Sequence, residues 1–368
     1  MIVTRKAARI ATLAVAAATF LCLVLSPAAQ GREPRKGFWG PQAVNGVSQF
    51  PMYSDLDVDL FQMAVRWDQV APTRPDRPGD PADPAYAWPP EVEAGLAEAE
   101  RYGMKVAILV TGTPGWANGG KPWQWAPKNP RDFAAFAGAA SRRYPAVKDW
   151  IIWGEPSFSR HFQPLSEDEG GRCSLSRRAA RGPRRYAELL DAAYGSLKSV
   201  SRSNRVIGGN NATIGTIAPL AWIRYMLLKN GRPPRMDLFG HNPFSAREPD
   251  LAQGPLPGCA ADFSDLDTVH RLVDARLARG RRKIPLFLSE FTIPTGPDRE
   301  FNFHVDLETQ ARWLARAFAI ARQVSWIDTL GWIHLYDEPP AGGAPVVKGG
   351  LLDYLGRPKP AYEVFRSS

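Results

Sequence analysis

The feature that most constrains the fold is a series of short apolar segments spread along most of the chain. They are rich in Val, Ile, Leu and Phe and seldom alternate with polar residues, a pattern typical of strands covered on both faces. Eight such strands are expected, at residues 38–44, 60–67, 104–111, 149–155, 205–211, 236–241, 284–290 and 329–336.

Helical patterns lie between these segments. Asn129 and Pro130 supply a cap and a first-turn proline, and apolar residues then recur at helical spacing. Pro90 and Asp306 mark two other helix starts. Further helices are expected at residues 184–201, 219–229 and 265–279, whereas the connection after the first strand has the weakest helical pattern.

Strands that alternate with helices in this way predict a single (β/α)8 barrel over residues 31–368. A doubly wound open sheet is the alternative, but the glycine-rich turn that usually follows its first strand is missing from the sequence. The proline-rich stretch at residues 72–90 is interpreted as a long loop after the second strand. In a barrel, that loop lies on the face that carries the active site.

The first 30 residues have the pattern of a secretory signal. Arg5, Lys6 and Arg9 precede an uncharged apolar run over residues 10–25, and small residues follow it. The run is short for a membrane-spanning helix, although an uncleaved anchor is the alternative. The sequence therefore predicts a secreted or extracytoplasmic protein. Cys173 and Cys259 would remain after cleavage, either as one disulfide or as two separate buried thiols.

The net charge is +9, and the three positive charges of the signal segment leave +6 on the rest of the chain. Arginines gather at residues 177–185, but no nucleic-acid-binding motif accompanies them, and such runs are usually solvated surfaces. No nucleic acid partner is therefore expected. No membrane partner is expected after signal cleavage either, and the oligomeric state stays open.

Two glutamates end predicted strands. Glu155 follows the fourth, in "DWIIWGEPS", and Glu290 ends the seventh, in "IPLFLSEFT". Strand ends of a barrel converge on one rim, so both carboxylates are expected at one site. Such a pair suits glycoside hydrolysis with retention, in which the two carboxyl groups lie about 5–5.5 Å apart. The simpler interpretation is that both are solvated loop residues.

Other chemistries find less support. The five histidines include no H-E-x-x-H pattern, the cysteines lack zinc-site spacing, and no G-x-S-x-G is present. No metal is expected, and the mechanism with two carboxylates needs no cofactor.

The order of several short motifs resembles the clan-A retaining glycoside hydrolases, the barrel superfamily of cellulase-like enzymes, β-xylosidases and β-galactosidases. "WGEP" and "LSEFT" resemble its acid/base and nucleophile strands, which implies these roles for Glu155 and Glu290. Four other motifs, "RWDQVAP", "TGTPGWA", "FGHNPF" and "LGWIHLY", resemble strands of the same clan. They imply substrate-site roles for Arg66, Trp116, His241 and Trp332.

Under this resemblance, Arg66 would lie beside Glu290 and keep it ionised, and Trp332 would be a sugar platform. His241 would bond the nucleophile or substrate, although a buried structural histidine is the alternative. The clan's asparagine before the acid is Gly154 here, and Asn210 or Asn211 is a candidate substitute. This departure leaves open a non-catalytic carbohydrate-binding protein. Sugar, linkage and endo or exo action are not indicated.

Overall fold

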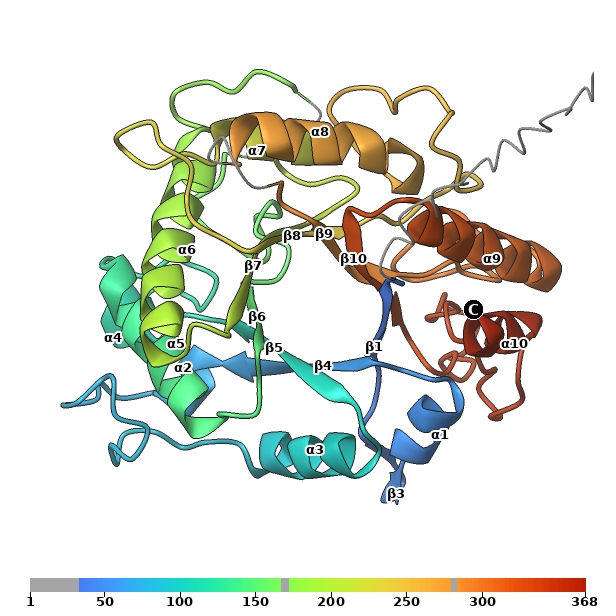
Figure 1. Ribbon diagram of the computed structural model, residues 1–368, viewed down its shortest axis with the longest axis horizontal. Coiled ribbons are helices and arrows are strands. Elements are labelled where there is room, and N and C mark those ends of the chain that lie inside the picture. Colours follow the sequence, from blue (N-terminus) through green and yellow to red (C-terminus); the bar gives the residue numbers. More distant parts are fainter. Residues whose placement is uncertain (1–32, 167–171, 279–282) are drawn as a thin grey trace, which may run out of the picture. The chain divides into compact units, whose positions relative to one another are not determined.

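A computed structural model describes residues 33–166, 172–278 and 283–368 (Figure 1). Eight of its strands close into a parallel barrel in the order β1-β10-β9-β8-β7-β6-β5-β4. Their bounds are Arg35–Trp39 (β1), Leu60–Arg66 (β4), Lys105–Thr111 (β5), Asp149–Ile152 (β6), Arg205–Ala212 (β7), Leu238–Asn242 (β8), Leu286–Phe291 (β9) and Ile327–Ile333 (β10). The predicted (β/α)8 barrel is confirmed, because β1 pairs with β10 and leaves no open edge.

Helices surround the ring of strands (Figure 1). The predicted caps are present: Asn129 accepts a hydrogen bond from the Arg131 amide, and Asp306 accepts one from the Thr309 amide. The helices are α1 Phe50–Asp55, α2 Trp67–Val70, α3 Pro90–Arg101, α4 Gly115–Asn118, α5 Pro130–Arg143, α6 Arg181–Val200, α7 Pro219–Tyr225, α8 Leu266–Arg276, α9 Leu307–Gln323 and α10 Pro360–Ser367, and a 3-10 turn, η2, spans Phe263–Asp265.

The first connection differs from the others, as its weak helical pattern indicated. A two-stranded hairpin, β2 (Ala43–Val44) and β3 (Val47–Ser48), precedes the short helix α1. Between β4 and α3, the proline-rich segment contains no strand or long helix. It is held by local bonds, including one from the Tyr86 hydroxyl to the Pro78 carbonyl at 2.5 Å.

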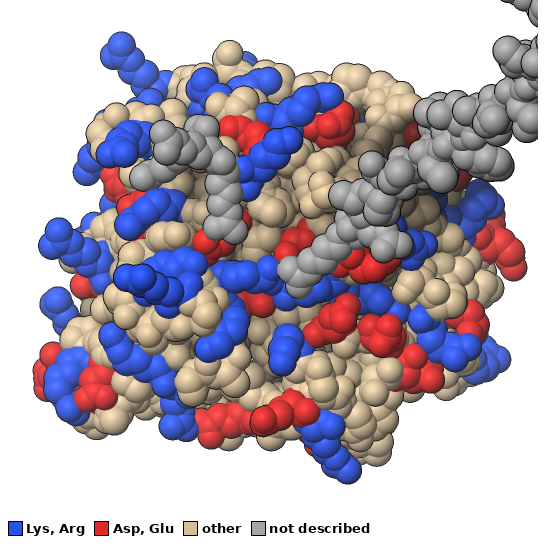
Figure 2. Space-filling view, in the orientation of Figure 1, with Lys and Arg blue, Asp and Glu red and all other residues tan. Residues whose placement is uncertain are grey.

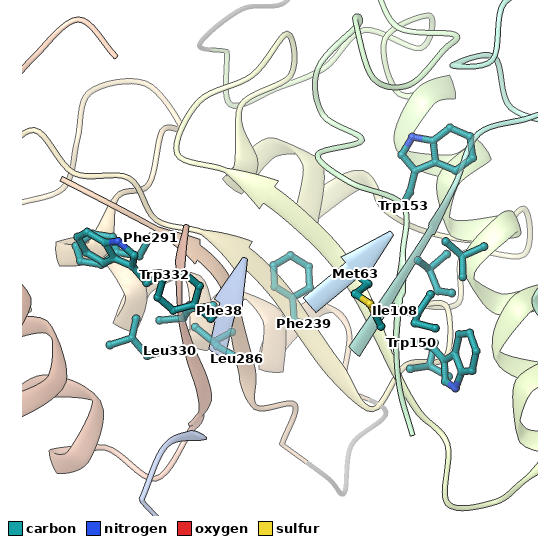
Figure 3. Packing of buried hydrophobic residues seen from close by; sticks show 14 of the residues in the cluster. Phe38, Met63, Ile108, Trp150, Trp153, Phe239, Leu286, Phe291, Leu330 and Trp332 are labelled. Atoms are coloured by element: carbon teal, nitrogen blue, oxygen red, sulfur yellow. The ribbon is translucent and has the colours of Figure 1, made fainter. Parts of the chain in front are cut away.

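Two apolar layers stabilise the barrel. One buried cluster joins side chains from six strands, namely Leu60, Ala107, Ile151, Ile207, Leu238 and Phe287. A much larger cluster lies between the strands and the helices, and it includes Phe38, Trp150 and Trp332. Figure 3 shows part of this larger cluster, with Phe291 beside Trp332. Burial on this scale is the main favourable term in folding.

A cluster of four charged residues, the Arg35–Asp149–Arg205–Asp328 cluster, lies where β1, β6, β7 and β10 begin. Arg35 bonds to Asp149 at 3.1 Å and to Asp328 at 2.7 Å. Arg205 bonds to the same two carboxylates, at 2.5 and 2.8 Å. Each charge therefore has two opposite partners at this end of the barrel.

Cys173 and Cys259 form a disulfide, with an S–S distance of 2.05 Å. It joins the segment before α6 to the connection between β8 and α8. The predicted signal segment, residues 1–30, lies outside the described residues, so that prediction and its domain boundary stay predictions. No helix in the described part of the chain has the length and apolar character needed to cross a membrane.

Candidate active site

A cavity of about 930 Å³ lies where the barrel strands end. Its walls come from the segments that follow β6, β7, β8, β9 and β10, and both Glu155 and Glu290 line it. This is the face on which barrel enzymes carry their active sites. The two glutamates, 135 positions apart in the sequence, therefore face the same cavity.

Glu155 is held shortly after β6 by an unusual backbone. Trp153 and Glu155 have positive φ values of 69° and 44°, and the Glu155 amide donates to the Asn210 carbonyl at 3.0 Å. Asn210 on β7 is itself left-handed, with φ of 52°. Such conformations are costly for residues other than glycine and persist where the surroundings enforce them, often at functional sites.

Glu290 lies on β9 with its side chain partly enclosed. Burial raises its pKa well above the ordinary value, and the negative charges of Glu155 and Glu300 raise it further. A hydrogen bond from Asn242 acts in the opposite direction. Glu155 acts on Glu290 in this way from the same cavity, which both side chains line.

Asn242, the last residue of β8, joins the two glutamates. Its Nδ2 donates to Glu155 Oε1 at 3.2 Å, and its side chain also hydrogen-bonds Glu290. Sequence reasoning chose its neighbour His241 instead. Side chains four residues apart on a strand point to the same face, so Asn242 shares a face with Leu238, which belongs to the buried cluster of six strands. This alternation could have identified Asn242 from the sequence.

Two histidines contact carboxylates of the cavity, and sequence reasoning missed both. His161 Nδ1 lies 3.3 Å from Glu155 Oε2. His334 Nε2 lies 3.4 Å from Glu300 Oε2, and this contact lowers the pKa of Glu300. His334 also has a positive φ of 77°. His161 lies on an irregular segment where periodicity gives no signal, whereas His334 lies just after β10, inside the stretch 329–336 that the sequence predicts as a strand.

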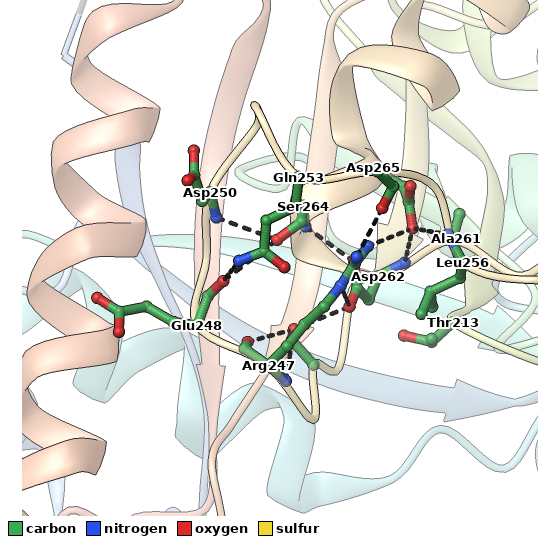
Figure 4. A network of polar contacts seen from close by, with 12 residues as sticks. Thr213, Arg247, Glu248, Asp250, Gln253, Leu256, Ala261, Asp262, Ser264 and Asp265 are labelled. Atoms are coloured by element: carbon green, nitrogen blue, oxygen red, sulfur yellow. Dashed lines mark hydrogen bonds and ion pairs between the residues drawn. The ribbon is translucent and has the colours of Figure 1, made fainter.

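One wall of the cavity belongs to the connection between β8 and α8. Arg247 bonds Asp262 at 2.7 Å and Asp265 at 3.1 Å, and Figure 4 shows its side chain extended between them. Asp262 also caps the 3-10 turn η2 through the Ser264 amide. Because Arg247 is held by these carboxylates, it fixes the shape of this wall.

Arg66 does not occupy the predicted place. Its guanidinium bonds Asp68 at 2.6 Å and lies 4.5 Å from the centre of the Trp123 ring. Among the hydrogen bonds and ion pairs of the described residues, none joins Arg66 to Glu290. The prediction that Arg66 keeps Glu290 ionised is therefore wrong, and the raised pKa of Glu290 agrees with this correction.

Trp116 is a packing residue. Its ring meets Trp67 edge to face at 5.3 Å, and its Nε1 donates to the Ala71 carbonyl at 2.9 Å. It does not line the cavity that holds the two glutamates. The position after β5 thus supports the proline-rich loop rather than that cavity.

Trp332 and His241 are buried. Trp332 is 1% exposed and packs edge to face on Phe291, so the prediction of a sugar platform is wrong. His241 is fully buried, its Nε2 lies 3.0 Å from the Ala261 carbonyl oxygen, and burial lowers its pKa to about 4. His241 is therefore a buried structural histidine, the alternative to a role in substrate binding, because its side chain faces away from the barrel interior.

Asn210 and Asn211 are also fully buried, and their side-chain atoms lack partners among the described residues. Neither lines the cavity, although Asn210 positions Glu155 through its backbone carbonyl. A β-carbon added at Gly154 would lie 3.4 and 3.6 Å from the two δ-carbons of Leu109, which is close to ordinary contact. Backbone and space at position 154 therefore accept a side chain.

The cavity thus brings together four carboxylates (Glu155, Asp262, Glu290 and Glu300), two imidazoles and the amide of Asn302, and Asn242 bonds Glu155. Such groups can donate and accept protons and can bond hydroxyl groups. No group of three or more histidine, cysteine or acidic side chains within the described ranges is arranged to hold a metal ion. On the face drawn in Figure 2, positive and negative side chains are interspersed.

No protein-family model matches the chain, and no curated protein sequence matches it. Solved structures do match. The chain is similar to a family 39 glycoside hydrolase from Bacteroides cellulosilyticus WH2, with a TM-score of 0.63 and 16% identity over 91% of this chain and 63% of that one. It is also similar to a glucosidase from Croceicoccus marinus, with a TM-score of 0.60 and 16% identity over 92% of this chain and 65% of that one.

A third similar structure is a family 39 β-xylosidase from Caulobacter crescentus, with a TM-score of 0.61 and 17% identity over 93% of this chain and 72% of that one. At such identities the likeness establishes the barrel fold. The chain spans less than two thirds of the length of the first two of these relatives.

Proposed function

We propose that the protein is a retaining glycoside hydrolase that cleaves a β-linked glycoside. The observation that carries the proposal is the pair Glu155 and Glu290, which face one cavity and share the amide of Asn242. The structural relatives named glycoside hydrolase, glucosidase and β-xylosidase support the same class of reaction.

In the proposed reaction Glu155 protonates the leaving oxygen while the Glu290 carboxylate attacks the anomeric carbon. A covalent glycosyl-enzyme forms, and Glu155, now ionised, takes a proton from the water that releases the sugar. Burial and the charges of Glu155 and Glu300 raise the pKa of Glu290 and so shift it toward its protonated form. Attack requires the ionised form of Glu290, and the amide of Asn242 favours that form.

A panel of 4-nitrophenyl glycosides, with product stereochemistry followed by NMR, tests this proposal. We expect hydrolysis of at least one β-glycoside with the β-anomer of the sugar as first product. Release of the α-anomer from a β-glycoside would contradict retention. Glu155→Ala should slow substrates with poor leaving groups most, whereas an equal loss for good and poor leaving groups would contradict its role as the acid.

A non-catalytic carbohydrate-binding protein is the second candidate, and Gly154 favours it. The clan's asparagine at this position bonds the sugar 2-hydroxyl, a contact that can supply several kcal/mol in the transition state. Gly154→Asn is expected to fold, because Leu109 leaves room for the new β-carbon. A binding protein predicts glycan affinity without turnover in the unmodified chain, whereas a weak hydrolase predicts turnover that rises in Gly154→Asn.

We also propose export from the cytoplasm through the signal segment at residues 1–30. Its support is the charged start and apolar run of the sequence, together with the disulfide between Cys173 and Cys259, a bond favoured in oxidising compartments. Mass spectrometry of the secreted protein should find a mature N-terminus near residue 31. A full-length chain retained in the cytoplasm would contradict export.

A further inference from the structure

A second cavity, of about 770 Å³, adjoins the one that holds Glu155 and Glu290. Its walls come from the segment after β1, from the end of β10 with the turn that follows it, and from residues 354–356. Ile333 and His334 line both cavities. The end of β10 is therefore the wall between them.

Two polar contacts run along this wall. His334 Nε2 lies 3.4 Å from Glu300 Oε2, and Arg299 donates to Glu338 Oε1 at 2.8 Å. Arg299 and Glu300 line the first cavity, whereas Glu338 lines the second. All four side chains are partly exposed, so these contacts contribute little to stability and their groups can bond a ligand on either side.

Aromatic side chains line the second cavity. Trp39 donates from Nε1 to Ser289 Oγ at 3.1 Å, next to Glu290 in the sequence, and Tyr336 donates to Gln49 Oε1 at 2.6 Å. Both rings are held in place by these bonds. Fixed aromatic rings among a few directed polar groups are typical of small-molecule sites.

Two exposed apolar side chains complete the lining of the second cavity. Tyr354 is 44% exposed and Leu355 is 60% exposed, whereas most large apolar side chains of the described chain are buried. Exposed apolar groups gathered at a cavity are expected where a ligand or partner covers them. The ligand must therefore offer an apolar face together with hydroxyl or other hydrogen-bonding groups for the polar wall.

We propose that the second cavity binds a further sugar unit of the same glycan, next to the unit held between Glu155 and Glu290. A pyranose ring has an apolar face for aromatic contact and a rim of hydroxyls for Glu338 and His334. The inference rests on the proposed function, and it adds that the protein prefers chains of two or more sugars. The inference depends on the wall that the two cavities share. A single glycan that occupied both cavities would contact Ile333 and His334 from each of them.

Tyr354→Ala tests the proposal with matched substrates. The probes are 4-nitrophenyl β-xyloside and β-glucoside, compared with 4-nitrophenyl β-xylobioside and β-cellobioside. We expect the unmodified protein to favour a disaccharide glycoside, and Tyr354→Ala to reduce that preference in kcat/KM about tenfold, as the loss of one well-packed ring predicts. Leu307→Ala is the control, because Leu307 is 39% exposed on α9 and lines neither cavity, so the preference should not change.

The inference is overturned if the disaccharide glycosides are cleaved no better than the monosaccharide glycosides, or if Tyr354→Ala slows both equally. Absence of any turnover would contradict the proposed function instead. In that case calorimetry tests whether the second cavity binds a sugar unit. Xylotriose and cellotriose are titrated into Glu290→Gln and into Glu290→Gln combined with Tyr354→Ala. Binding weakened about tenfold by the second substitution supports the inference. No binding, or equal binding, overturns it.

Discussion

Two clusters of charged side chains lie at opposite ends of the barrel, and their charges are balanced differently. Where the strands begin, Arg35 and Arg205 each bond both Asp149 and Asp328. Where the strands end, Glu155, Glu290 and Glu300 line one cavity. There Glu155, shortly after β6, and Glu290, on β9, share the amide of Asn242 rather than a guanidinium.

The difference appears in the pKa values. Burial alone would raise the pKa of Asp328, but the charges of Arg35 and Arg205 outweigh it and lower the pKa. Burial also raises the pKa of Glu290, and there the neighbouring charges of Glu155 and Glu300 add to the effect. Glu290 and Asp328 are both enclosed, yet their pKa values shift in opposite directions, because the charges beside them have opposite signs.

The comparison separates a structural cluster from a functional one. Charges that neutralise one another hold strand starts together, whereas like charges forced together cost stability and are retained where chemistry uses them. The like charges of Glu155, Glu290 and Glu300 therefore mark a candidate site independently of any sequence motif. It also assigns the Arg35–Asp149–Arg205–Asp328 cluster to the stability of the barrel.

The largest expected effect is on catalysis by Glu290→Ala. If Glu290 is the nucleophile, kcat should fall at least about 1000-fold on the best substrate of the panel. The fold should remain, because the substitution removes a carboxyl group with a raised pKa and with no cationic partner among the described residues. Initial rates and circular dichroism measure the two effects. Activity close to that of the unmodified protein would place the chemistry elsewhere.

The opposite result is expected from Asp149→Asn at the other end of the barrel. Arg35 and Arg205 would each lose an ionic partner, which should destabilise the fold by about 3–5 kcal/mol. Below its melting temperature the variant should keep kcat within about twofold, because the site lies at the far strand ends. Urea unfolding and initial rates provide the measurements. Unchanged stability would show that this cluster does not hold the strand starts together.

Asn242→Ala should reduce kcat about 10- to 100-fold, because a donor shared by both carboxylates is lost. Its hydrogen bond lowers the pKa of Glu290, so its removal should raise that pKa and move the acid limb of the kcat/KM profile to higher pH. A merely structural role would lower activity without moving the limb. Asn242→Asp is the matched variant, and its added negative charge should move the limb in the same direction.

Glu300→Gln should shift the acid limb in the opposite direction, by less than about one pH unit. Glu300 raises the pKa of Glu290, so removal of its charge should lower that pKa and move the limb to lower pH. Because Glu300→Gln and Asn242→Ala should move the acid limb in opposite directions, the two variants together test whether Glu290 sets that limb. A shift to higher pH in Glu300→Gln would contradict the proposed electrostatics.

The pH dependence of stability tests the same contrast between Glu290 and Asp328. The folded-state pKa of Glu290 is raised, so its charge destabilises the fold only as pH rises above the unfolded-state pKa. Glu290→Gln should therefore be more stable than the unmodified protein near neutral pH and equal to it in acid. Asp328→Asn should be less stable near neutral pH. Urea midpoints at several pH values give both comparisons, and destabilisation by Glu290→Gln at neutral pH would contradict the first.

The sequence was sufficient to predict the barrel and the position of its two glutamates. Covered strands have a continuous apolar pattern, and the end of each strand must reach the same rim. Asn129 and Asp306 were correctly predicted as helix caps, because capping depends on neighbouring residues alone. Local patterns were therefore reliable wherever a single element decided the outcome.

The remaining site residues depend on contacts that no local pattern encodes. Arg66 bonds Asp68 two positions away, and Trp332 is enclosed by Phe291 from the neighbouring strand. His334 lies just after β10 and its amide donates to the Trp39 carbonyl at 3.2 Å, whereas His161 lies in an irregular segment where its amide donates to the Phe158 carbonyl at 3.0 Å. The choice of His241 over Asn242 was an error of one position, and one position reverses the face of a strand.

The most direct test of the central claim is to identify the residue that carries the sugar during turnover. The protein is incubated with 2,4-dinitrophenyl 2-deoxy-2-fluoro-β-xyloside or β-glucoside, digested and analysed by mass spectrometry. The account predicts one fluorosugar on the peptide that contains Glu290, and none in Glu290→Gln. A fluorosugar attached to any other residue would contradict the proposed convergence of Glu155 and Glu290 on one anomeric carbon.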